Sequence, residues 1–65
     1  MNKIKLSTLS AASLKELESS INAFLEDDEV AGYQLLNATV REVEERTYSS
    51  NEEEFNAILT FIKNV

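Results

Sequence analysis

The segment from Ser13 to Leu25 constrains the fold more than any other part of this 65-residue chain. Its apolar residues recur every three or four positions, which is the spacing of one stripe along an α-helix. Ser13 and Glu16 stand in the S-x-x-E order of a capping box, in which the serine hydroxyl accepts a hydrogen bond from a first-turn amide. The sequence therefore predicts a helix that buries one face, made of Leu14, Leu17, Ile21, Phe24 and Leu25.

Before this helix, residues Asn2 to Leu9 alternate between apolar and polar side chains, which is typical of a half-buried strand. Lysines that point outward are a common way to protect an edge strand from aggregation. A single strand cannot satisfy its own backbone hydrogen bonds, so further strands are expected in the same chain. The predicted strand has Ile4 and Leu6 on its inner side and Lys3, Lys5 and Ser7 on its outer side.

After the helix, four consecutive acidic residues from Glu26 to Glu29 oppose the helix dipole, so the helix is expected to end there. These residues lack the alternating ligands, the glycine and the final glutamate of an EF-hand, which indicates a solvated connector rather than a calcium site. Gly32, the only glycine, predicts a turn or the start of a new element.

Beyond Val30 the pattern fits two structures. In the first, Tyr33 to Val43 is a strand, a turn near Ser49, Ser50 and Asn51 follows, and Phe55 to Lys63 returns as a second strand; β-branched and aromatic residues favour this structure. In the second, both segments are helices, because their apolar residues also fit helical spacing and Asn51 or Ser50 suits a helix N-cap.

We favour the α+β arrangement βαββ, with one helix packed on a three-stranded antiparallel sheet, over an all-α three-helix bundle. A bundle would leave the first strand without a partner. Gly32, Asn37, Thr39 and Thr47 also suit a helix interior poorly. Because a chain this short has room for only one core, residues 1–65 are expected to form a single domain.

Three stretches carry a resemblance to a known family: Leu17–Leu25, the Gly32–Leu36 step into an extended segment, and Phe55–Lys63. Together they resemble the small βαββ proteins of unknown function found in sporulation gene sets and mobile elements of low-GC Gram-positive bacteria. The resemblance implies a helix between a first strand and a C-terminal hairpin. It brings no catalytic residues and no cofactor.

Composition argues against several classes of function. Twelve acidic residues and six basic ones give a formal net charge of −6, and no cluster of Lys and Arg suits nucleic acid. Without histidine or cysteine, the commonest general base, the strongest nucleophile and the usual zinc ligands are absent. None of the serines stands in a nucleophile motif. We therefore expect no enzyme activity, no metal and no cofactor.

No apolar run approaches the roughly 20 residues of a membrane span. The first residues also lack the apolar segment, roughly 7–15 residues long, of a secretory signal. We expect a small acidic cytoplasmic protein of bacterial or phage origin that interacts neither with membranes nor with nucleic acid.

The last predicted strand, Phe55 to Lys63, is apolar on both faces, and one helix covers only one face of a sheet. In the strand interpretation Phe55, Ala57, Leu59 and Phe61 point one way, and Ile58 and Ile62 point the other. We expect a non-catalytic protein-interaction module, homodimeric or bound to another protein through its second sheet face or an edge. The candidate interface residues are Ile58, Ile62, Phe61 and Tyr33.

A second hypothesis has a different functional class. Small, acidic, cysteine-free chains also suit a phage- or plasmid-encoded inhibitor of a host defence protein. Such an inhibitor would act as an acidic mimic or by sequestering a small ligand between protomers. The sequence leaves this alternative open.

Overall fold

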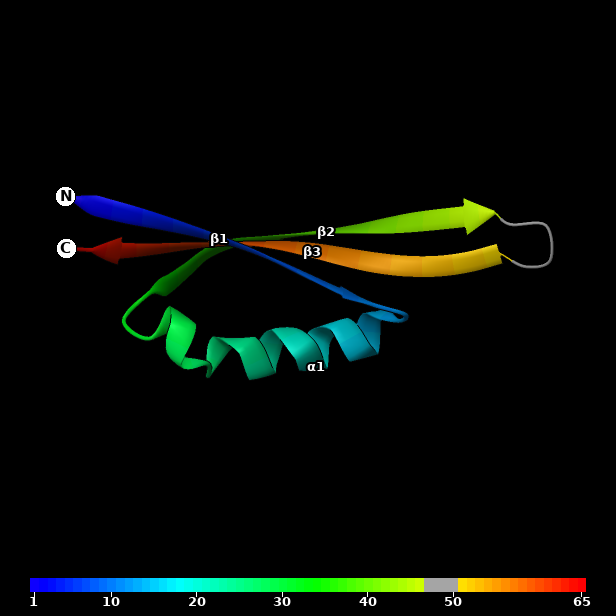
Figure 1. The fold of residues 1–65 in the computed structure, drawn as a ribbon, viewed down its shortest axis with the longest axis horizontal. Helices are drawn as coiled ribbons and strands as arrows, with labels where there is room; N and C mark the ends of the chain where they lie inside the picture. The colour runs from blue at the N-terminus through cyan, green and yellow to red at the C-terminus, as the bar shows by residue number, and fades with distance from the viewer. Residues whose placement is uncertain (47–50) are drawn as a thin grey trace.

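The computed structural model describes residues 1–46 and 51–65, and it has the predicted order of one helix and three strands (Figure 1). The βαββ prediction is confirmed, and the three-helix alternative is wrong. The predicted turn at Ser49 and Ser50 lies outside the described residues. The elements are β1 (Asn2–Ala11), α1 (Leu14–Leu25), the short 3-10 helix η1 (Asp28–Val30), β2 (Gln34–Arg46) and β3 (Asn51–Asn64).

The sheet has the order β1-β3-β2, so the last strand of the fold lies in the middle and pairs antiparallel with both others. β1 pairs with β3 from Asn2 opposite Asn64 to Ala11 opposite Phe55. β2 shifts register between Leu35 and Asn37, which marks a bulge, and its pairing with β3 continues past the end of β1. The molecule is therefore elongated, with a longest dimension of 50 Å.

The helix begins and ends where the sequence predicts. Ser13 is the N-cap, with φ −144° and ψ 160°, and its hydroxyl accepts a hydrogen bond of 3.2 Å from the amide of Glu16. The last helical residue is Leu25; the amide of Glu26 donates to the carbonyl of Ala23, and the amide of Asp27 donates to the carbonyl of Phe24. The predicted turn at Gly32 is also present, because this residue has φ +82°, in the region that favours glycine.

The buried core lies between α1 and the sheet. It consists of Leu17, Val30, Ala57, Leu59 and Phe61. Of the predicted helix stripe, Leu17 is buried and Ile21 and Phe24 pack against the core, but Leu14 is 58% exposed and Leu25 40% exposed. The stripe is buried at its middle and exposed at both ends, because the ends of the helix extend past the core.

The two sides of β1 are reversed from the prediction. Ile4 and Leu6 face away from the helix and are 51% and 67% exposed, whereas Lys5 is half-buried on the helix side. The reason is that Leu9 and Ala11 share the side of Lys5, and this apolar end of β1 is the part that packs against the core. The Lys5 ammonium lies 5.9 Å from the centre of the Tyr33 ring, which compensates for its position.

Candidate protein-interaction surface

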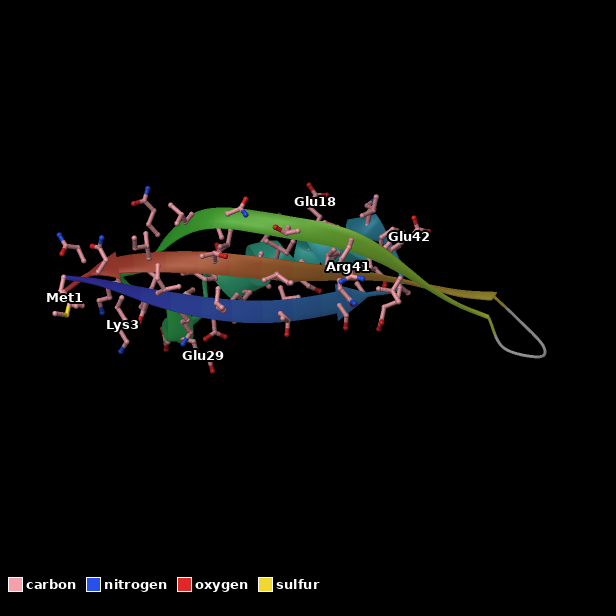
Figure 2. All side chains as sticks on the ribbon, turned by 90° about the horizontal axis from the view of Figure 1, so that it is seen from above. Met1, Lys3, Glu18, Glu29, Arg41 and Glu42 are labelled. Carbon is pink, nitrogen blue, oxygen red and sulfur yellow. The ribbon has the colours of Figure 1, made fainter. Side chains whose placement is uncertain are left out.

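The surface of the sheet opposite α1, which we call the open face, has no element of the described chain covering it (Figure 2). The strand register places the exposed side chains of Ile4 and Leu6 on this face, beside Ile58, which is 40% exposed, and the half-buried Ile62. Ile4 lies directly opposite Ile62. These four side chains come from two neighbouring strands, so they form one apolar strip along the sheet rather than scattered contacts.

The rest of the open face is polar and mostly uncharged. Asn37 and Thr39 come from β2, and Thr8 and Thr60 lie among the apolar residues of the strip. Among the residues that the structure describes, Arg41 of β2 is the cation that lies on this face, opposite Asn56. Burying such a surface against another protein removes few charges from water, which is the composition expected at the centre of an interface.

The four interface residues proposed from the sequence do not lie together. Ile58 and Ile62 are on the open face as predicted. Phe61 is only 1% exposed and lies in the core on the helix side of the sheet, away from the open face. Tyr33 packs against the core on the helix side, between the ammonium groups of Lys5 and Lys63, and is not part of the open face.

Sequence reasoning missed Ile4 and Leu6, which contribute more exposed apolar surface than the two isoleucines it selected. The signal was present in the alternation of β1, because that pattern groups Ile4 with Leu6. The pattern could not show which face of the sheet the helix covers, and so it could not show that Ile4 and Leu6 are exposed.

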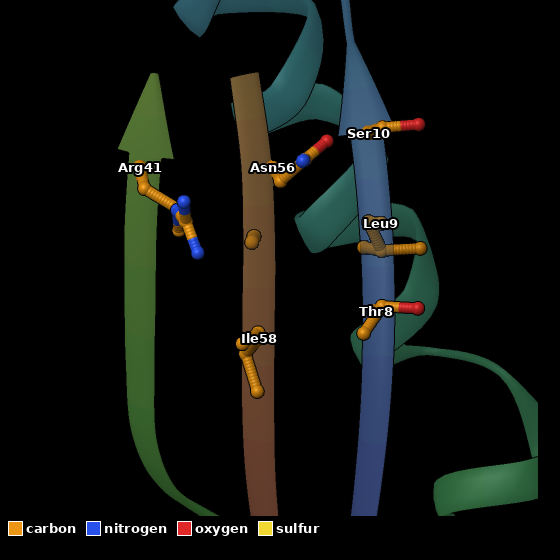
Figure 3. Close-up of a pocket in the computed structure, with 7 residues that line it drawn as sticks. Thr8, Leu9, Ser10, Arg41, Asn56 and Ile58 are labelled. Atoms are coloured by element: carbon orange, nitrogen blue, oxygen red, sulfur yellow. The ribbon is translucent and has the colours of Figure 1, made fainter. Parts of the chain in front are cut away.

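A shallow depression of about 360 Å³ lies at the polar end of the open face (Figure 3). Arg41, Asn56 and Ser10 form one row across the three strands there. The guanidinium of Arg41 reaches from β2 toward β3, whereas the hydroxyl of Ser10 points away from it. The donors therefore do not converge on one point, and the depression does not have the arrangement of a small-ligand site.

A second apolar feature lies on the other side of the sheet, between α1 and β2. We call it the α1–β2 groove. It has a volume of about 160 Å³, and almost all of the surface that lines it is apolar. Its apolar walls are Leu14, Leu17 and Ile21 of the helix and Val40 of β2, with Glu18 and Asn22 at the rim.

In the part of the chain that the structure describes, no group of three acidic side chains is placed to hold a metal ion. The described helices are too short and too polar to cross a membrane. The two apolar surfaces are thus the features of the described residues that suggest a function.

The comparisons with known proteins give no match, either to a family model, to a curated protein or to a solved structure. The class of the protein is accordingly defined by the fold itself, as an α+β domain of βαββ order with an uncovered apolar sheet face.

Proposed function

We propose that this chain is a non-catalytic interaction module that self-associates by packing the open faces of two copies against each other. The observation that carries the proposal is the apolar strip of Ile4, Leu6, Ile58 and Ile62 on a sheet face without a covering element. Contiguous apolar patches of this kind mark protein interfaces on soluble domains.

The size of the exposed surface supports association. The chain exposes 5056 Å², whereas a compact monomer of its mass of 7.3 kDa is expected to expose about 4,200 Å². The surplus of about 900 Å² belongs to the whole elongated chain, including the part of β2 and β3 that extends past β1, and leaves surface that a partner can cover. The Cα radius of gyration, 14.3 Å against about 10.7 Å for a compact chain of this length, reflects the same elongation.

A second copy is the simplest partner for this face. Two sheets stack about 10 Å apart when their side chains interdigitate, and a two-fold axis between them places the same residues on both sides. Such a contact joins two apolar strips and adds the core volume that a single domain of this size lacks.

The test is the mass of the assembly at high micromolar concentration, measured by size-exclusion chromatography with light scattering. The natural chain is expected to form at least a dimer, and Ile58→Glu to halve the mass, because it places a charge in the strip. Leu25→Glu is the matched control: Leu25 is also 40% exposed but lies at the end of the helix, away from the open face. We expect it to leave the mass unchanged.

Circular dichroism establishes that each variant is folded. A natural chain that runs as a monomer of about 7 kDa, or a folded Ile58→Glu variant with unchanged mass, overturns the proposal.

A further inference from the structure

The helix leaves part of its own side of the sheet uncovered. Val40 and Leu35 of β2 lie opposite the buried Ala57 and Phe61 in the register, so they are on the helix side. They are nevertheless 46% and 37% exposed, because α1 packs mainly against β1 and β3. The α1–β2 groove is the result, and it opens toward the free edge of β2.

That edge is protected differently from the other one, because its charged residues between the bulge and Val43 are Arg41 and Glu42, which are of opposite sign. The free edge of the sheet on the β1 side carries Lys3 and Lys5, the type of residue that discourages pairing with another strand. β2 has its bulge before Asn37, and from there to Val43 it contains no lysine, proline or glycine. Between Asn37 and Val43, alternate residues of β2 thus direct their unpaired backbone N–H and C=O groups to the free edge, beside an apolar groove.

We propose that β2 of a second copy pairs antiparallel with this edge and joins two sheets into one of six strands. The two-fold axis of such a pair is perpendicular to the sheet, so both helices lie on the same side and the two α1–β2 grooves open onto each other. This interface uses different residues from the open face and does not depend on it.

The charges of β2 and the length of its free segment together select the register. Residues opposite each other in an antiparallel ladder point to the same face of the sheet. The two-fold axis therefore lies between the two copies of one β2 residue, which face each other. An axis at Arg41 or Glu42 places two like charges opposite each other. An axis at Val40 avoids this, because Ala38 then faces Glu42 and Thr39 faces Arg41 of the other copy. It also lets all seven residues from Asn37 to Val43 pair.

Engineered cysteines test the register directly, because the natural chain has none. With Val40 on the axis, the two Cα atoms of this residue lie about 4.5–5.5 Å apart, within disulfide range. The two copies of Thr39 lie about 8 Å apart, beyond it. Under mild oxidation Val40→Cys is expected to give a covalent dimer on a non-reducing gel, and Thr39→Cys to remain a monomer on that gel. The opposite result, or no dimer from Val40→Cys, overturns this register.

A matched pair of charge variants tests the interface in solution by native mass spectrometry. It uses Ile58→Glu as the background, because this substitution removes the open-face contact. In the background alone we expect a dimer. Adding Ala38→Glu places a carboxylate opposite Glu42 of the other copy and is expected to give monomers, whereas Ala38→Lys faces the same carboxylate with an ammonium and is expected to keep the dimer. Circular dichroism and thermal unfolding check that every variant is folded.

The results distinguish the two interfaces. The natural chain is expected to be a tetramer of two stacked six-stranded sheets. If the natural chain is a dimer that Ile58→Glu converts to monomers, the edge pairing is wrong and the open-face proposal stands. If the natural chain is a dimer that Ala38→Glu dissociates and Ile58→Glu does not, the edge pairing stands and the open-face proposal is wrong. A folded Ala38→Glu, Ile58→Glu chain that remains a dimer overturns the edge pairing.

Discussion

The ring of Phe24 on α1 meets the ring of Phe61 on β3 edge to face, with centroids 5.9 Å apart and planes inclined at 61°. This contact joins the helix to the central strand, since Phe61 is 1% exposed and lies on the helix side of the sheet. Edge-to-face pairs contribute about 0.5–1.5 kcal/mol beyond the apolar area that they bury.

We predict a coupling energy of about 0.5–1.5 kcal/mol between Phe24→Leu and Phe61→Leu in a double-mutant cycle of urea unfolding. Leucine keeps most of the apolar volume and removes the ring interaction, so each single variant is expected to remain folded. All four proteins are compared at one concentration, because self-association changes apparent stability. If the losses of unfolding free energy in the two single variants simply add in the double variant, the rings contribute no specific interaction beyond ordinary packing.

Leu17→Ala tests how much the core depends on one helix residue. Leu17 is 1% exposed, and truncating a fully buried leucine lowers the free energy of unfolding by about 2–5 kcal/mol. For a domain of this size, with a stability of about 3–10 kcal/mol, such a loss is expected to remove a large share of the free energy of unfolding. The control is Leu14→Ala, since Leu14 is 58% exposed and its loss is expected to be much smaller. Thermal unfolding followed by circular dichroism measures both, and equal effects would contradict the buried position of Leu17.

Gly32→Ala is expected to lower the free energy of unfolding by about 1 kcal/mol, because an L-residue with φ +82° is strained. Space is not the limiting factor, since the nearest atom to an added Cβ is Cε of the flexible Lys63 side chain, at 3.4 Å. Gly32→Asn is the control, because asparagine tolerates this conformation better than alanine. Chemical unfolding of the three proteins gives the comparison, and an alanine variant as stable as the natural chain would show that the turn adjusts.

Lys3→Glu is expected to stabilise the sheet. Lys3 lies directly opposite Lys63 in the β1–β3 register, and like charges at opposed positions destabilise a strand pair. We predict a gain of about 0.2–0.5 kcal/mol, small because Lys3 is exposed to solvent. Lys3→Gln, which only removes the repulsion, is expected to fall between the two. Because salt screens exposed charges, the melting temperatures of the three proteins should converge at 1 M NaCl. A difference in melting temperature that persists there would have another origin.

Local signals in the sequence were sufficient for much of the fold. The hydroxyl of Ser13 and the spacing of Leu17, Ile21 and Phe24 located the helix, because caps and helical periodicity depend on neighbours in the chain. The opposite directions of Ile58 and Phe61 could also be predicted locally, because two residues an odd number of positions apart in a strand point to opposite faces.

Other features depended on packing between distant segments. The alternation of β1 separated Ile4 from Lys5 but carried no information on which side the helix would cover. The packing of Leu9 and Ala11 against the core decided it, and this placed Ile4 on the open face. The partly uncovered inner side of β2, including Val40, is likewise a consequence of where a narrow helix rests on a three-stranded sheet.

The central position of β3 also affects how the molecule is made. β1 and β2 do not touch as neighbours in the sheet, and each obtains its ladder only from β3, which is synthesised after both. On the ribosome, β1 and β2 therefore emerge without a template, and the sheet closes in one late step across long sequence separations, such as that between Asn2 and Asn64. Folding of this domain should accordingly wait until β3 has left the exit tunnel, and the nascent β1 and β2 stay open to chaperones until then.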